Sequence, residues 1–213
     1  DLSCEAQREA VAIADALRAA LDSVTSSGGL TAMLAAQERG RAGATLGEVR
    51  NRADVIVFWG VDPRGRYPRY PTRYAPEPAG VHVAEGRRSR TVVAVDIGGA
   101  VGPADADMRV TIRPEDEVAV LTALTAAVRG PALPEDGEPW NTARTLAPCL
   151  TQARYAVIVS DAEAAAGDGR DPGRAAALTV LTQTLNGITR AAVSALRGGG
   201  NRSGADVVMT AQT

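Results

Sequence analysis

Arginine and tyrosine side chains crowd one short stretch of this 213-residue chain. Its charged and aromatic members are Arg64, Arg66, Arg69, Arg73, Tyr67, Tyr70 and Tyr74, and a second group follows at Arg87, Arg88 and Arg90. Guanidinium groups pair carboxylates through two parallel hydrogen bonds. Arginine and tyrosine are also enriched as anchors of protein interfaces. The stretch is predicted to form a positive surface that docks a protein, with capture of an acidic ligand or a solvated charge run as the alternatives.

The chain has few residues with a thiol or an imidazole side chain. The chain has two cysteines, Cys4 and Cys149, and one histidine, His82. A structural zinc site or an iron–sulfur cluster usually takes four Cys or His ligands, so this chain alone is not expected to hold either in the usual way. Buried, inert thiols and a structural or surface histidine are predicted. The motifs HExxH, GxxxxGK[ST] and GxGxxG are absent, so no catalytic residue is expected.

An apolar segment leads directly into the arginine-rich stretch. Residues 55–58 are apolar without interruption, which is typical of a strand buried on both faces of a parallel sheet, and Gly60 and Pro63 end it. Ligands of open α/β sheets bind at the carboxyl ends of the strands. The turn that contains Gly60, Asp62 and Pro63 is therefore a predicted functional position, and an ordinary surface turn is the alternative.

Strand and helix patterns alternate along the rest of the chain. Further strands are predicted over residues 91–95, 108–112, 155–160, 191–196 and 206–210. Helices are predicted over residues 5–21, 31–39, 116–129, 141–152 and 172–185. The alternation predicts an α/β fold with Rossmann-like, doubly wound, mostly parallel sheets. Because residues 131–140 are rich in Pro, Gly and acidic side chains, two lobes are predicted, 1–130 and 131–213.

The chain ends and the composition add three expectations. The chain opens on a helix pattern without Met and closes just past a strand pattern, so further residues are expected before Asp1 and after Thr213. Acidic and basic totals of 25 and 23 nearly cancel, which argues against a nucleic-acid or anionic-membrane partner. No apolar run reaches membrane-spanning length and no signal-peptide pattern opens the chain, so a cytoplasmic location is expected.

The stretch from residue 46 to residue 74 resembles the B subunits of formylmethanofuran dehydrogenases and their relatives in the formyltransferase/hydrolase complexes of methylotrophic bacteria. The resemblance rests on LGEVRNRAD at 46–54, FWGVDP at 58–63, and the pairs at 68–69 and 73–74, with weaker matches at 92–96, 112–117 and 200–205. It implies the fold of the molybdopterin oxidoreductases, as in the domains of formate dehydrogenase and DMSO reductase.

In the pterin-binding relatives, the resemblance implies that the positions of Gly60, Asp62, Pro63 and Asp96 help to hold a pterin-guanine dinucleotide. Two departures weaken this role. Asp96 is followed by Ile-Gly-Gly-Ala where relatives commonly carry Pro-Arg-Arg-Thr, which removes an arginine fork for phosphate. Residues 26–29 read Ser-Ser-Gly-Gly where metal-binding relatives place a cysteine. These pterin positions are therefore expected to be degenerate, with no cofactor and no metal.

The resemblance then implies a non-catalytic scaffold, the B subunit of a formyltransferase/hydrolase complex. Such a complex converts formyl-tetrahydromethanopterin to formate through a methanofuran-like carrier in one-carbon metabolism. Its amidohydrolase-like A subunit and its C and D subunits, which include the formyltransferase, are the implied partners. A polyglutamylated carrier is a further implied ligand of the arginine-rich stretch. The alternatives are the B subunit of a tungsten- or molybdenum-pterin formylmethanofuran dehydrogenase and a free-standing nucleotide-binding module.

Overall fold

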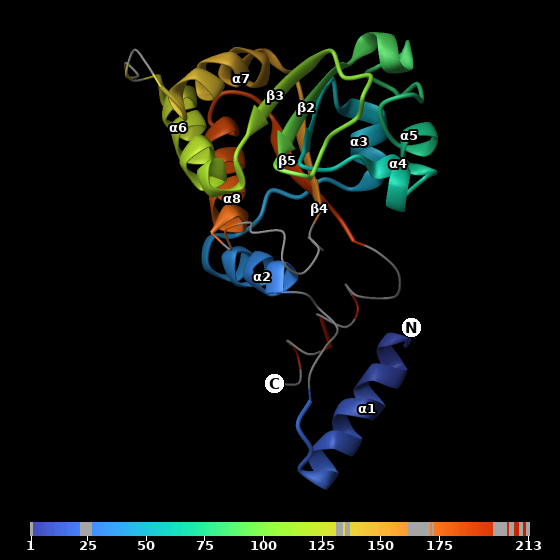
Figure 1. Cartoon of the computed structure of the whole chain (residues 1–213). Coiled ribbons are helices and arrows are strands. Elements are labelled where there is room, and N and C mark those ends of the chain that lie inside the picture. Colours follow the sequence, from blue (N-terminus) through green and yellow to red (C-terminus); the bar gives the residue numbers. More distant parts are fainter. Residues whose placement is uncertain are drawn as a thin grey trace.

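A five-stranded parallel sheet lies at the centre of the protein, with strand order β3-β2-β1-β4-β5 (Figure 1). The computed structural model describes residues 2–21, 27–130, 134, 137–161, 171, 173–197, 204, 207, 208 and 211. The strands are β1 Val55–Trp59, β2 Thr91–Ile97, β3 Met108–Ile112, β4 Ala156–Asp161 and β5 Ala191–Leu196. The predicted α/β fold with a doubly wound parallel sheet is confirmed.

Strand β1 occupies the middle of the sheet because its side chains are apolar on both faces. All of its residues are buried, and it pairs with β2 on one side and β4 on the other. Val57 and Trp59 pack into the core on one face, whereas Ile56 and Phe58 pack into the core on the other. The continuous apolar run thus serves two cores at once.

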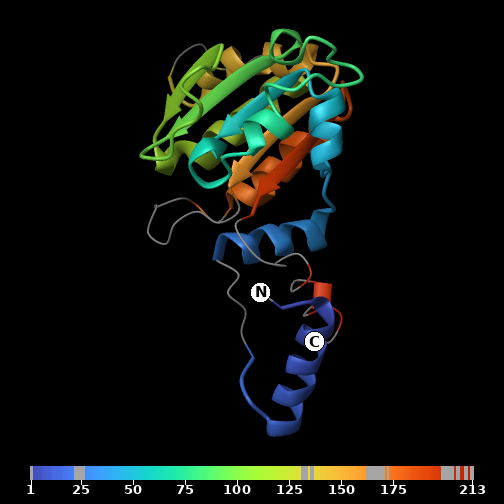
Figure 2. The same cartoon turned by 90° about the vertical axis from the view of Figure 1, so that its right-hand side faces the viewer.

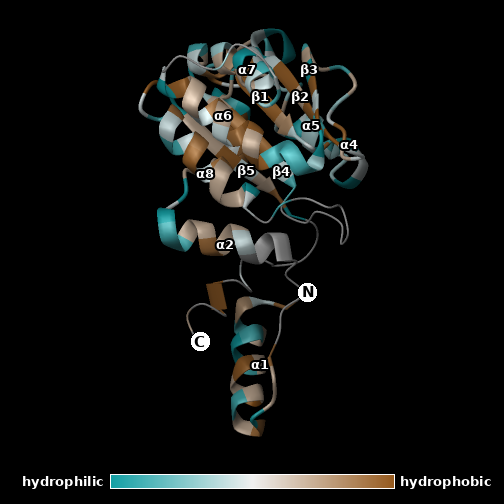
Figure 3. Ribbon diagram, turned by 60° about the vertical axis from the view of Figure 1, so that its left-hand side comes forward, coloured by the Kyte–Doolittle hydropathy of each residue, from teal (hydrophilic) through white to brown (hydrophobic). Residues whose placement is uncertain are grey.

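Helices cover both faces of the sheet, and the apolar strands appear as brown ribbons beneath them (Figure 3). One face carries α6 Glu117–Arg129, α7 Trp140–Gln152 and α8 Arg174–Leu185. The other carries α3 Leu46–Arg52, α4 Pro63–Arg66 and α5 Tyr70–Arg73. Two short 3₁₀ helices, η1 Gly86–Ser89 and η2 Pro114–Asp116, lead into β2 and α6. The loops that follow the strands therefore meet at the carboxyl edge of one sheet.

The sheet crosses the boundary predicted between residues 130 and 131. Strands β4 and β5 come from the second predicted lobe, yet β4 pairs with β1 over the whole length of β1. The described residues thus share one sheet where two lobes were expected. A breaker-rich segment marks a connection between elements, but its composition does not determine which sheet the next strand joins.

The edge of the sheet at β5 is covered by the chain that precedes α3. Val193 donates its backbone N–H to the carbonyl of Ala42 at 2.8 Å, and Ala44 donates to the carbonyl of Val193 at 3.2 Å. Gly43 bridges Val193 in parallel orientation. This short pairing satisfies part of the outer backbone of an edge strand and fixes the entry into α3.

Two helices lie outside these layers. Helix α2 Ser27–Arg39 packs against α8, whereas α1 Cys4–Leu17 stands apart from the sheet and has no buried residue (Figures 1 and 2). The helix predicted to reach residue 21 ends at Leu17, because Arg18 adopts a left-handed conformation with φ of 51°. Among the described residues, no helix has the length and apolar content that a bilayer-crossing segment requires.

Two further predictions need correction. Cys4 is exposed on α1, so the expectation of a buried thiol was wrong for this residue. Val207 and Val208 are helical where a last strand was predicted over residues 206–210, and the other residues of that range lie outside those described. A short apolar run has no periodicity that separates strand from helix.

Candidate functional site

The segment FWGVDP forms a tight turn from β1 into α4 at the carboxyl edge of the sheet. Gly60 has a φ of 62°, and its N–H donates to the carbonyl of Val95 in β2 at 2.8 Å. The carboxylate of Asp62 accepts the N–H of Arg64 at 2.9 Å and caps α4, while buried Pro63 begins that helix. Gly60, Asp62 and Pro63 thus each have a local structural role.

Asp96, near the end of β2, holds the loop that leads to β3. Its carboxylate accepts the N–H of Gly102 at 2.8 Å and pairs with the Arg109 guanidinium, whose Nη1 lies 2.7 Å from Oδ1 and 2.5 Å from Oδ2. Gly102 passes so close to β2 that an added Cβ would lie 2.7 Å from the Cβ of Ala94. Asp96 is 8% exposed, and its partners leave the carboxylate little surface for a ligand.

The positions implied for pterin binding therefore meet at one edge, at the ends of neighbouring strands. Both carboxylates among them, Asp62 and Asp96, are held by donors from the chain itself. Within the described parts of the chain, no group of three His, Cys, Asp or Glu side chains is arranged to hold a metal ion. The buried Asp96 carboxylate, engaged by Gly102 and Arg109, does not fit the grip on a pterin dinucleotide that the resemblance implies for its cofactor-binding relatives.

Cys149 lies at the opposite edge of the sheet. It borders a pocket with Val55 and Thr91, the first residues of β1 and β2. Burial, followed by the charges of Asp54 and Asp107, raises the pKa of the Cys149 thiol. The thiol is therefore kept protonated, as expected of an inert cysteine.

Acidic partners neutralise much of the arginine-rich stretch. Arg64 forms two hydrogen bonds of 2.9 and 2.8 Å with the carboxylate of Asp105. Arg66 pairs with Asp161 at 3.3 Å, and Arg87 pairs with Asp107 at 2.7 Å. These carboxylates come from distant parts of the sequence, so no local sequence pattern could predict the ion pairs.

Two residues assigned to the positive surface lie in the interior. Arg90 is 4% exposed and donates to four backbone carbonyls, those of Ala53, Pro76, Pro78 and Arg50 at 3.0, 2.5, 2.7 and 2.5 Å. Tyr70 is also 4% exposed, and its ring meets Phe58 edge-on with centroids 6.4 Å apart. Burial lowers the pKa of Arg90 and raises that of Tyr70. Arg90 therefore belongs to the support beneath the surface, whereas Tyr70 reaches the surface only where it borders a groove.

Arg90 binds the carbonyls of Arg50 and Ala53 in the segment LGEVRNRAD. Thr45 and Glu48 form a capping box that starts α3, and Val49 is fully buried. The carbonyl of Asn51 accepts the N–H of His82 at 2.8 Å, and His82 itself is exposed. This helix thus holds the long loop before β2 through backbone contacts, and His82 has the surface position that was predicted.

The remaining arginines of the stretch, Arg69 and Arg73, are exposed and form no ion pair with the described residues. Arg69, Tyr67 and Tyr70 border a groove together with Arg41 and Arg197. Arg41 and Arg197 were missed by the sequence analysis because they lie far from residue 69 in sequence, and the sheet order alone brings them together.

Comparisons with known proteins identify relatives of the chain. No family model matches the chain. Over 127 residues, 60% of the chain, it is 34% identical to the B subunit of the tungsten-containing formylmethanofuran dehydrogenase 2 of Methanococcus maripaludis, and to the protein of the same name from Methanocaldococcus jannaschii. The chain is a homologue of formylmethanofuran dehydrogenase B subunits. The resemblance identified in the sequence is therefore confirmed. The chain spans 29% of the length of each of these B subunits.

A solved structure extends the likeness to nearly the whole fold. The formyltransferase/hydrolase complex FhcABCD from Methylorubrum extorquens, determined with methylofuran, contains a chain that matches 97% of this one with a TM-score of 0.72. The match covers 54% of that chain at 23% identity, so it bears on the fold alone. The B-subunit homologue described here thus shares its architecture with a component of that complex.

Proposed function

We propose that this chain is part of a non-catalytic scaffold subunit in a formyltransferase/hydrolase complex of one-carbon metabolism. One observation carries the proposal: Asp62 and Asp96, at the positions implied for pterin binding, are each held by donors of the chain itself. The shared fold with a chain of FhcABCD supports the same assignment. In this proposal, the subunit contributes its fold, which holds the catalytic subunits in place.

The proposed docking surface is the exposed part of the arginine-rich stretch. Arg66 and Arg73 are the exposed last residues of α4 and α5, and the half-buried Tyr74 directly follows Arg73. Exposed arginines around a tyrosine are the composition of an interface anchor. The proposed partners are an amidohydrolase-like A subunit and the C and D subunits that include the formyltransferase. An acidic, polyglutamylated methanofuran-like carrier is the second proposed occupant of this surface.

Affinity purification of the full-length protein from its native host tests the scaffold. We expect the transferase and hydrolase subunits to co-elute with the wild-type protein and to be lost from the double variant Arg66→Glu/Arg73→Glu. Arg129→Glu, on α6 at the other face of the sheet, is the matched control and should retain them. An intact complex with weaker carrier binding would favour carrier capture. A wild-type protein that elutes without any partner would contradict the scaffold.

A dehydrogenase component is the second candidate, because the curated homologues are named as tungsten-containing enzymes. The measurement that separates the two is elemental analysis of the full-length protein purified under anoxic conditions. Tungsten or molybdenum near one atom per chain, together with extractable pterin, would establish the dehydrogenase and remove the scaffold proposal. Metal at trace level is the result expected for the scaffold.

A further inference from the structure

A groove of about 510 Å³ runs between strand β5 and helix α5. One wall is built by Ser194, Ala195 and Leu196 of β5. The other is built by three tyrosines in and next to α5, Tyr67, Tyr70 and Tyr74. Three arginines also line it, Arg41, Arg69 and Arg197. A volume of this size is typical of sites for small organic ligands.

The three arginines come from separate segments that the fold holds in place. Arg41 directly precedes the residues that pair along the outer edge of β5, so its backbone is fixed beside that strand. Arg197 directly follows β5, and Arg69 is the residue before α5. The positive charges are therefore positioned by strand pairing and helix boundaries and not by one flexible loop.

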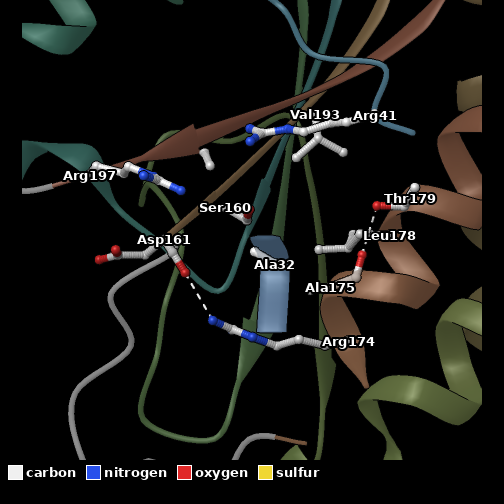
Figure 4. Close-up of a pocket in the computed structure, with 11 residues that line it drawn as sticks. Ala32, Arg41, Ser160, Asp161, Arg174, Ala175, Leu178, Thr179, Val193 and Arg197 are labelled. Carbon is white, nitrogen blue, oxygen red and sulfur yellow. Dashed lines mark hydrogen bonds between the residues drawn. The ribbon is translucent and has the colours of Figure 1, made fainter. Parts of the chain in front are cut away.

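Positive charge gathers in the groove. Among the described residues that line it, none is Asp or Glu. Asp161, in the small cavity that shares Arg41 and Arg197, pairs with Arg66 at 3.3 Å. Arg41 and Arg197 extend toward one another in that cavity (Figure 4). Partial burial, followed by the charge of Arg197, lowers the pKa of Arg41. An anion beside Arg41 would stabilise its charge.

The aromatic wall is preformed. Tyr70 packs on Tyr74 with ring centroids 5.9 Å apart and on Phe58 at 6.4 Å, so three rings support one another. Tyr67 and Tyr74 are half-buried and line the groove beside Tyr70. Rigid tyrosines offer contact area at low entropic cost, and flat or apolar groups pack on their faces. The wall therefore suits the body of an organic ligand, whereas the arginines suit its charged ends.

We propose that this groove binds a small organic anion that carries at least two carboxylate or phosphate groups. Arg41 and Arg69 pair the anionic groups, and the tyrosine wall contacts the rest of the ligand. The site is distinct from the pterin positions at Asp62 and Asp96, since none of those residues lines it. The inference is also independent of the scaffold, because neither Arg66 nor Arg73 lines the groove.

Isothermal titration of the full-length protein with citrate and with pyrophosphate tests the groove. We expect wild-type binding that weakens with added salt and that falls by about tenfold or more in Arg41→Gln and in Arg69→Gln. Arg129→Gln, at an exposed arginine of α6 outside the lining, should bind as the wild type does. Tighter binding of pyrophosphate would assign phosphate groups to the ligand, and tighter binding of citrate would assign carboxylates.

Two results would overturn the inference. One is a wild-type protein that binds neither probe. The other is a double variant Arg41→Gln/Arg69→Gln that binds a probe as tightly as the wild type, while its thermal unfolding midpoint stays unchanged. Because the scaffold test uses Arg66 and Arg73, loss of partners and loss of anion binding are separate readouts.

Discussion

The indole N–H of Trp59 donates a 2.8 Å hydrogen bond to the carboxylate of Glu117, across 58 residues of sequence. Trp59 ends β1 and is 1% exposed, whereas Glu117 begins α6 and is fully buried. Both residues lie in segments that carry the resemblance to the B subunits. Their contact ties the central strand to a covering helix, so the tryptophan of the FWGVDP segment has a structural role.

Replacing Trp59 with Phe should destabilise the protein. The substitution keeps an aromatic ring but removes the donor that faces a buried carboxylate, so we expect a loss of about 1–3 kcal/mol in the free energy of unfolding. Denaturant unfolding measures it. The control is Trp140→Phe, at a half-buried indole at the start of α7 that packs on the same core. Equal effects of the two substitutions would contradict a special role for the hydrogen bond.

Replacing Arg90 with Lys should be costly although the charge is kept. A lysine ammonium lacks the planar fork that reaches the carbonyls of Ala53, Pro76 and Arg50, so at least one buried acceptor loses its partner. We expect a loss of about 1–3 kcal/mol, measured by chemical unfolding. Arg88→Lys, at an exposed neighbour, should change stability by less than about 0.5 kcal/mol. An Arg90→Lys variant with an unchanged free energy of unfolding would show that the loop before β2 does not depend on the guanidinium.

Replacing Gly80 with Ala should disturb the contact between the long loop and α3. An added Cβ would overlap the carbonyl oxygen of Arg50 and would lie 2.7 Å from the Cα of Asn51. Because both obstacles are backbone atoms, we expect a loss of about 1–3 kcal/mol, seen as a lower thermal midpoint. Gly65→Ala, which has no atom within 4 Å of the new Cβ, is the control and should be close to neutral. Similar midpoints for both variants would rule out the close approach.

The ion pair of Asp107 should make part of the stability depend on pH. The hydrogen bond from Arg87, together with the N–H of Val92, lowers the pKa of Asp107 below its ordinary value of 3.8. A carboxyl with a depressed folded-state pKa stabilises the fold above its unfolded pKa, and this contribution is lost as the pH falls through the folded value. The stability difference between wild type and Asp107→Asn should therefore be largest near neutral pH and shrink in acid.

Urea unfolding at about pH 7 and about pH 3 measures this difference. In an Arg87→Gln background, where the main cause of the shift is gone, Asp107→Asn should have a smaller effect. A stability difference that stays constant between the two pH values would contradict the assignment.

All five strands of the sheet were predictable from sequence because each is a short run rich in apolar residues, either continuous or alternating. The helix over Glu117–Arg129 was predicted to within one residue of its start, whereas the short helix over Leu46–Arg52 was not predicted. What sequence did not reveal depends on the order of the strands. The burial of Arg90 required knowing which carbonyls surround it, and the neutralisation of Arg66 required placing Asp161 beside it. The groove of Arg41, Arg69 and Arg197 exists because residues 42–44 run beside β5.

The two edge strands of the sheet, β5 and β3, differ in how many backbone hydrogen-bonding groups they leave unpaired among the described residues. At β5 the pairing of residues 42–44 occupies the backbone donor and acceptor of Val193, which leaves an arriving strand fewer backbone groups to pair with. At the opposite margin, β3 pairs with β2 and, among the described residues, with no further strand. A foreign polypeptide that joined this protein by β-augmentation would therefore add at Met108–Ile112, on the far side of the molecule from the arginine groove.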